Sequence, residues 1–188
     1  MARQVNYVPR FIETSRVMSR PHLLFCLQFD FYMTNRVPLS DFQLPEGVHP
    51  RIQSFYQLWL DAGDGEVPAS SCFDIAALSA EYPLLASIKA QGPDEAFVWH
   101  EVAAVSHWPF NQPVEGRPVI ESVRPLSVKR ILGTLRQIFS SGVPDYYETT
   151  SWMYGGRTQS LARLVVPVTV EGGRELISLW EAMDPMHS

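Results

Sequence analysis

The sequence predicts an α+β domain with a five-stranded antiparallel sheet, helices on one face of that sheet, and an N-terminal arm. Two observations lead to this fold class. Apolar runs of strand length stand in two groups, before and after the clearest helical stretch, residues 125–141. The last three runs are separated by "YGGR" and "EGGR", short glycine-centred turns typical of antiparallel hairpins. Strands that flank a helical insert in this way indicate α+β architecture.

The chain divides at a connector rich in proline, residues 36–50, into an arm and linker over 1–46 and a domain over 47–188. In the arm, "FCLQFDFYM" alternates roughly at period two, which favours a strand. A lone apolar strand must dock either on the domain or on a second subunit. The residues expected to make these arm or dimer contacts are Phe25, Leu27, Phe29, Phe31 and, on the first helix of the domain, Trp59.

Two helices are predicted at the start of the domain. In "HPRIQSFYQLWLDAGDGEVP", apolar residues recur at i, i+3, i+4 and i+7, which predicts an amphipathic helix ended by the glycines and the proline that follow. Its apolar face consists of Ile52, Phe55, Tyr56 and Trp59. The stretch "CFDIAALSAEYP" predicts a short helix that begins near Asp74 and ends before Pro83.

The remaining elements are strands around one long helix. A hairpin is expected from "LLASIKAQ" and "EAFVWHEVA", with its turn at 92–94. After an irregular helical stretch, the helix over 125–141 has Pro125 in its first turn and ends at Gly142, followed by Pro144. Three strands complete the sheet: "DYYETTSWM", "TQSLARLVVPVTV" and "RELISLWEAM".

Pro167 tests this assignment, because it lies inside the second of these three strands. A proline removes one hydrogen bond from a sheet ladder and is found at edges or bulges. We therefore expect the partner strand, residues 145–153, to have ended or bulged at the level of Pro167. A fully paired strand through Pro167 would contradict the assignment.

Charge and composition exclude several classes of protein. The net charge is −5, and the two lysines, Lys89 and Lys129, form no basic cluster of the kind that nucleic-acid binding needs. The longest apolar stretch, residues 23–33, is far shorter than the roughly 20 residues of a membrane helix. Cys26 and Cys72 have no spacing typical of zinc ligands, which agrees with a reducing cytoplasm. The sequence therefore predicts a cytoplasmic protein that binds neither nucleic acid nor membrane.

The segment "FVWHEVAAVSHWPF", residues 97–110, brings two histidines and two tryptophans together. Strand alternation places Trp99 and His100 on opposite faces, so they cannot line one pocket. His107 and Trp108 follow on a loop, where they either form a pocket wall or pack on the core, which is the commoner role of aromatic residues. His100 and His107 lack a third ligand at a known spacing, so no metal is predicted.

Arg163 is the other candidate, because it stands in an otherwise apolar strand. It can pair with a ligand carboxylate or with Glu148 across the sheet, and we favour the Glu148 pair. The sequence contains no nucleophile elbow, no paired carboxylates and no phosphate-binding glycine loop, so no catalytic residue is predicted. The candidate ligand-pocket residues are His100, His107, Trp108 and Arg163.

The stretch from about 48 to 184 resembles the PAS superfamily, and more narrowly a PAS-like family of largely uncharacterised alphaproteobacterial proteins. The landmarks, in chain order, include "FYQLWLDAGDGEVP", "FDIAAL", "GTLRQIFSSGVPDYY" and "LARLVVPVTVEGGRELISLWE". The resemblance implies an antiparallel sheet that cups helices on one face, with a hollow that in some relatives holds a small ligand, haem or flavin. It also implies a dimer formed by the outer sheet face and the leading helix.

The sequence lacks the motifs by which PAS relatives bind haem or flavin. Haem-binding relatives use a histidine on the long helix, and residues 125–141 contain none. The flavin-binding cysteine of photoreceptor relatives lies on the helix after the second strand, whereas Cys72 precedes the first. No cofactor is therefore predicted.

The function predicted from these observations is a non-catalytic, PAS-like sensory or regulatory module of the bacterial cytoplasm. It would form a homodimer, bind a small-molecule ligand, and act through a separate output protein. The alternative is a small α+β enzyme or carrier whose aromatic-lined cavity takes an apolar or aromatic compound. The aromatic loop at residues 106–112 motivates this alternative.

Overall fold

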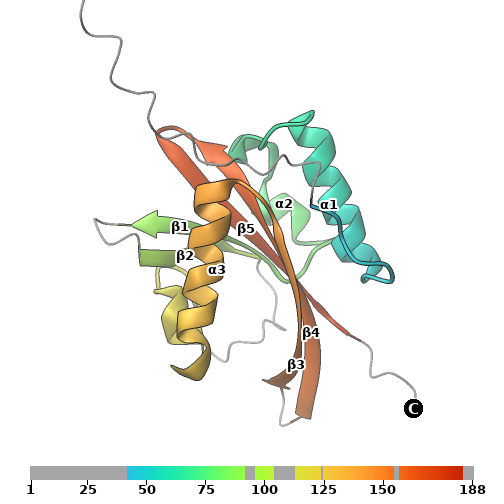
Figure 1. Cartoon of the computed structure of the whole chain (residues 1–188), viewed down its shortest axis with the longest axis vertical. Helices are drawn as coiled ribbons and strands as arrows, with labels where there is room; N and C mark the ends of the chain where they lie inside the picture. The colour runs from blue at the N-terminus through green and yellow to red at the C-terminus, as the bar shows by residue number, and fades with distance from the viewer. Residues whose placement is uncertain (1–41, 92–95, 104–112, 124, 155–156, 184–188) are drawn as a thin grey trace, which may run out of the picture. The chain divides into compact units, whose positions relative to one another are not determined.

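The computed structural model describes residues 42–91, 96–103, 113–123, 125–154 and 157–183, and the side chains of 149–154 and 157–159 are left out of the description. All these residues belong to one compact unit, Thr34–Ser188. Its elements are the five strands and three α-helices labelled in Figure 1, joined by short 3₁₀ turns. The predicted α+β fold with a five-stranded antiparallel sheet is confirmed. The boundary at residue 46 between arm and domain stays a prediction.

The first helix, α1 (Pro50–Gly63), forms as its pattern predicts. It starts with proline at its first position and with His49 as its N-cap, and it ends at Asp64 in the left-handed conformation, with φ of 46°. Its buried residues are Ile52, Phe55, Tyr56 and Trp59, the four predicted from their spacing.

A short helical region follows α1. It contains a 3₁₀ turn (Ser70–Cys72) and the helix α2 (Ile75–Leu78). The carboxylate of Asp74 accepts a hydrogen bond from the Ala77 backbone N–H at 3.0 Å, which caps α2. This agrees with the predicted start near Asp74.

The sheet has the strand order β2-β1-β5-β4-β3, and every neighbouring pair is antiparallel. Its strands are β1 (Leu85–Gln91), β2 (Ala96–Val102), β3 (Asp145–Tyr154), β4 (Arg157–Val170) and β5 (Gly173–Ala182). The β1–β2 hairpin is confirmed, although its predicted turn at 92–94 lies outside the described residues. The first and last strands of the chain's fold therefore meet, because β5 inserts between β1 and β4.

The long helix, α3 (Val128–Ser141), ends as predicted at Gly142, whose φ of 76° suits a glycine. Its start differs from the prediction, because Pro125 lies in a separate 3₁₀ turn (Pro125–Ser127) that leads into the helix. A further 3₁₀ turn (Val119–Ser122) lies in the predicted irregular stretch, of which residues 104–112 are outside the described residues.

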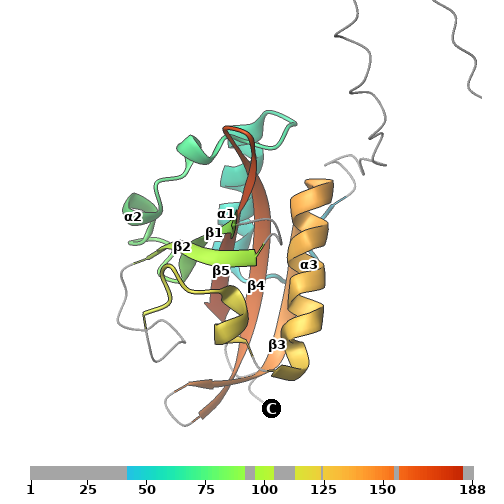
Figure 2. The same ribbon diagram turned by 90° about the vertical axis from the view of Figure 1, so that its left-hand side faces the viewer.

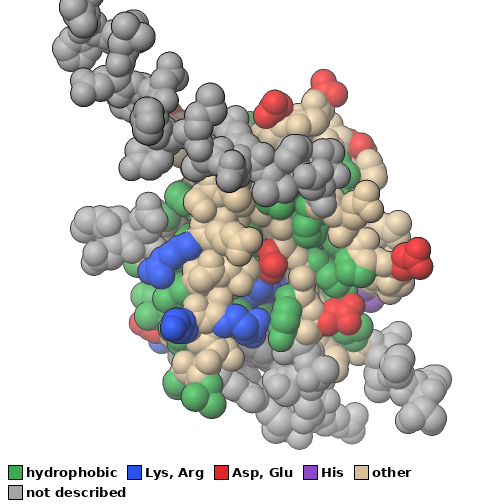
Figure 3. Space-filling view, in the orientation of Figure 1, with side chains coloured by type: hydrophobic (Ala, Val, Ile, Leu, Met, Phe, Trp, Pro, Cys, Tyr) green, Lys and Arg blue, Asp and Glu red, His purple; other side chains and the backbone are tan. Residues whose placement is uncertain are grey.

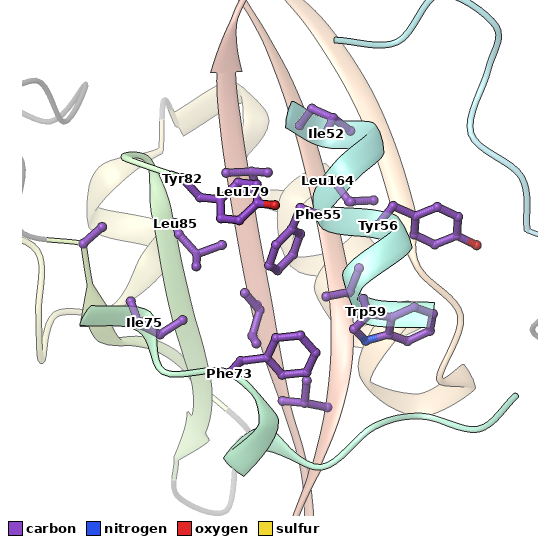
Figure 4. Close-up of a cluster of buried hydrophobic side chains, with 14 of the residues drawn as sticks. Ile52, Phe55, Tyr56, Trp59, Phe73, Ile75, Tyr82, Leu85, Leu164 and Leu179 are labelled. Carbon is purple, nitrogen blue, oxygen red and sulfur yellow. The ribbon is translucent and has the colours of Figure 1, made fainter. Parts of the chain in front are cut away.

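Each face of the sheet carries its own hydrophobic cluster, because side chains alternate along the strands. On one face, α1 packs against Leu164 and Leu179, as Figure 4 shows. On the other face, α3 packs through Ile131, Leu135 and Ile138 in a cluster with Val165 and Trp180 of β4 and β5. Figures 1 and 2 show the two helices on different sides of the β4–β5 hairpin. The predicted placement of the helices on one face of the sheet is therefore wrong, because α1 covers one face and α3 the other.

The expectation for Pro167 is confirmed. Pairing between β3 and β4 runs from Tyr154 down to Asp145, which is opposite Val165, so β3 begins too late to reach Pro167. In place of a backbone donor from β3, the indole N–H of Trp59 on α1 donates to the Pro167 carbonyl at 2.7 Å. The proline therefore lies where β4 has no strand on that side, and a side chain from α1 satisfies its carbonyl.

Within the described residues, no helix is long and apolar enough to cross a membrane.

Candidate functional site

The histidines and tryptophans of residues 97–110 do not form one site in the described part of the chain. Trp99 is 2% exposed and belongs to the cluster beneath α3, where its indole N–H donates to the Ser122 hydroxyl at 3.2 Å. The His100 side chain is 40% exposed and lies 3.6 Å from the Glu101 carboxylate. His107 and Trp108 lie outside the described residues, so their place in a pocket stays a prediction.

Two further sets of sequence-predicted contacts can be located in part. Phe25, Leu27, Phe29 and Phe31 of the arm lie outside the described residues. Trp59 is 0% exposed, and its side chain contacts the sheet. In the described residues it fixes α1 to the sheet, and a contact with the arm or a second subunit stays a prediction.

Arg163 is the sequence-predicted candidate that the structure places in a chemically unusual position. It lies in the middle of β4, opposite Tyr147 of β3 and Trp180 of β5, on the face that α3 covers. Its side chain is 4% exposed, which is rare for an arginine, and its guanidinium carbon stands 5.5 Å from the centre of the Trp180 ring.

The carboxylate that pairs with Arg163 is Asp145 rather than Glu148. Glu148 is opposite Ala162, so it lies on the α1 face, where its carboxylate accepts from the Tyr146 hydroxyl at 2.6 Å. Asp145 is opposite Val165 and lies on the same face as Arg163. Its Oδ2 is 3.4 Å from Nη2 of Arg163. Arg163 thus forms the predicted cross-strand ion pair, but with Asp145, because the side chain of Glu148 lies on the other face of the sheet.

Two buried polar atoms in this region have no hydrogen-bond partner among the described residues: Nε of Arg163 and Oγ of Ser178. Ser178 is 1% exposed and is opposite Val165, two positions along β5 from the residue opposite Arg163. Such diagonal neighbours lie about 7–8 Å apart, within reach of a long side chain. Leaving a buried donor unpaired costs about 1–3 kcal/mol, so two on one face call for an explanation.

Arg163 has both a negative and a positive neighbour. Burial lowers the pKa of Arg163, Asp145 raises it, and the nearby Arg130 lowers it. An arginine begins from so high a pKa that it stays protonated at neutral pH. Arg130 itself lies over the ring of Tyr147, with 4.4 Å from its guanidinium carbon to the ring centre. Asp145 and Arg130 are therefore two charged neighbours of Arg163 with opposite effects on its pKa, and Asp145 is the one in contact with it.

We call Arg163, Ser178, Trp180 and Asp145 the Arg163 cluster. Sequence reasoning identified Arg163 alone. Ser178 and Trp180 could have been found by counting back from the "EGGR" turn, because Val170 pairs with Gly173 and the register continues without a shift to Arg163 and Trp180. Asp145 could not be found in this way, because the β3–β4 register shifts between Thr149 and Trp152.

A second buried charge lies on the opposite face of the sheet. Glu181 of β5 is 5% exposed, and its Oε2 is 3.4 Å from Nη1 of Arg51 on α1. Burial raises the pKa of Glu181, while Arg51 and His49 lower it. The pair joins the start of α1 to the sheet, and the other carboxylate oxygen, Oε1, has no hydrogen-bond partner among the described residues.

The described residues contain no group of three His, Cys, Asp or Glu side chains that could hold a metal ion. The Arg163 cluster offers instead a guanidinium edge, a hydroxyl and an indole face. These groups can bind and orient a small molecule by hydrogen bonding, charge and stacking.

Comparisons with known proteins place the chain in no family. No protein family and no curated protein matches the sequence. Among solved structures, the chain is similar to the PAS domain of an HTR-like protein from Haloarcula marismortui, with a TM-score of 0.39 and 19% identity over 57% of this chain and 87% of that one. This similarity is too low to assign a family, and membership of the alphaproteobacterial PAS-like family stays a prediction from the sequence.

Proposed function

We propose that this chain is a non-catalytic sensory or regulatory module that binds a small molecule at the Arg163 cluster. It acts through a homodimer or a separate output protein, in the bacterial cytoplasm that the sequence predicts. Support comes from the α+β fold and from the sequence landmarks that resemble the PAS superfamily.

The observation that carries the proposal is the buried Arg163, whose Nε has no partner among the described residues. A buried charge is stabilising only when it is fully paired and hydrogen-bonded. Here one 3.4 Å contact to a partly exposed carboxylate is what the described residues provide. An arginine kept in this state fits a residue selected for binding rather than for stability.

The experiment is native mass spectrometry of the freshly purified full-length chain, together with its absorption spectrum. The expected result is a small molecule bound to the wild-type protein and absent from Arg163→Met. The matched control is Arg51→Met, which removes the arginine that pairs with a carboxylate on the other face of the sheet. A wild-type protein that carries no small molecule, and whose melting temperature no metabolite raises, would overturn the proposal.

A role in dimer formation is proposed for the arm. Its alternating apolar pattern in residues 25–33 supports an intermolecular contact. Light scattering of the full chain and of a chain that begins at residue 36 tests this. We expect two subunits for the full chain and one for the truncated protein, with the number of subunits taken from the mass divided by the mass of each chain. An unchanged mass and an unchanged melting temperature would mean that the arm does not hold the subunits together.

A further inference from the structure

The contact between Asp145 and Arg163 is incomplete on both sides. Its 3.4 Å is longer than the roughly 2.7–2.9 Å of a good charged hydrogen bond. The Asp145 side chain is 38% exposed, whereas that of Arg163 is 4% exposed. Asp145 therefore reaches the buried guanidinium from the rim of the sheet and keeps much of its contact with water.

Arg163 has an edge that this contact uses only in part. Nε and Nη2 lie on the same edge of a guanidinium, and a planar carboxylate binds such an edge with both of its oxygens. Asp145 contacts Nη2, and Nε has no partner among the described residues. Half of a carboxylate-binding edge is thus unoccupied by the protein groups described.

The surroundings of this edge favour an anion with an apolar body. Leu161, Val165 and Trp180 belong to the hydrophobic cluster on the same face, and Ser178 adds a hydroxyl with no partner in the described structure. Charge also favours an anion, because α3 carries basic residues and no acidic one in "VKRILGTLRQIFSS". Lys and Arg side chains gather around α3 on the face seen in Figure 3. A positive surface of this kind attracts anions from solution.

We propose that the ligand of the Arg163 cluster is a small organic carboxylate, and that it displaces Asp145 from Arg163. Its two oxygens accept from Nε and Nη2, the Ser178 hydroxyl donates to it, and its apolar body packs beside Trp180. This inference rests on the proposed function, because it names the ligand class of the same site. Asp145 acts as an internal counter-ion for the empty site.

Displacement has a structural consequence, because Asp145 is the first residue of β3 and follows the end of α3 at Gly142 by three positions. The junction between α3 and β3 loses its contact to the centre of the sheet when the ligand binds. Binding is thereby coupled to the segment that connects the long helix to the edge strand.

The test is a titration of the full chain, unfolded and refolded to remove any bound ligand, with three probes: acetate, benzoate and inorganic phosphate. Tryptophan fluorescence reports binding, since Trp180 lies beside the site. Asp145→Asn removes the internal competitor at a partly exposed position, so it should keep the fold. We expect it to bind benzoate about tenfold more tightly than wild type. Arg163→Met should lose binding, and Arg163→Lys, which keeps the charge but not the planar edge, should weaken it.

Glu181→Gln is the matched control, because it removes a carboxylate paired with arginine on the opposite face. It should leave benzoate affinity unchanged. The inference is overturned if Asp145→Asn binds neither acetate nor benzoate more tightly than wild type, if binding survives in Arg163→Met, or if phosphate alone binds. A neutral ligand found by native mass spectrometry, lost in Arg163→Met but unaffected by Asp145→Asn, would overturn this inference and leave the proposed function standing.

Discussion

Replacement of Trp59 tests how α1 is fixed to the sheet. The side chain is 0% exposed, and its N–H donates to the Pro167 carbonyl at 2.7 Å, where β4 has no neighbouring strand on the β3 side. Trp59→Ala removes the buried ring and this hydrogen bond. Deletion of a buried tryptophan costs about 3–5 kcal/mol, and we expect a loss of unfolding free energy in that range.

A second variant separates packing from hydrogen bonding. Trp59→Phe keeps an aromatic ring but leaves the Pro167 carbonyl unsatisfied, so we expect a loss of about 1–3 kcal/mol from this cause. Leu58→Ala is the control on the same helix, because Leu58 is 37% exposed and its loss should stay within about 0.5 kcal/mol.

The assay is urea unfolding of the full-length protein, followed by circular dichroism, with the slope of the transition compared among variants. A loss below about 1 kcal/mol for Trp59→Ala, the range of ordinary surface changes, would refute the packing of α1 on the sheet. A Trp59→Phe variant as stable as wild type would refute the role given to the indole hydrogen bond.

Two further predictions concern stability. Gly133→Ala should stabilise the protein by up to about 1 kcal/mol, because a Cβ at this exposed position of α3 would meet nothing within 4 Å; a lower melting temperature would contradict it. Glu181→Gln should be at least as stable as wild type at neutral pH. Burial raises the pKa of Glu181 in the folded chain, so the wild type loses stability as pH rises through that pKa. The advantage of the variant should vanish near pH 4, measured by thermal unfolding, and a constant difference would contradict it.

Much of the fold could be predicted, because local patterns here agree with the tertiary structure. The spacing of Ile52, Phe55 and Trp59 predicted α1, and Gly142 marked the end of α3. The position of Pro167 predicted that β3 ends before reaching it. Such signals depend on neighbours in sequence, which are visible without coordinates.

The candidate site could be predicted only in part, since its contacts join distant strands. The sequence pattern identified Arg163 as unusual, but the predicted partner was Glu148. The shift in register between Thr149 and Trp152 means that counting from the β3–β4 turn does not give the partner. Whether Nε of Arg163 has a hydrogen-bond partner depends on the rotamer of its side chain, which cannot be predicted from the sequence pattern.

The packing of α1 and α3 on opposite faces of the sheet was the other feature that the sequence did not predict. Periodicity predicted amphipathic helices at α1 and α3, but their expected placement on one face of the sheet came from the fold class and not from any contact in the sequence. The structure places them on different faces, with Trp59 buried between α1 and the sheet.

Under the proposed function, Arg163 serves binding and not stability. The most direct test is the unfolding free energy of Arg163→Met, refolded without ligand, compared with wild type. Because Asp145 can return to water when its partner is removed, we predict a variant at most about 2 kcal/mol less stable, the worth of the lost buried contact to Trp180, or more stable than wild type. A loss of about 3–5 kcal/mol, as when a structural buried ion pair is broken, would contradict the account.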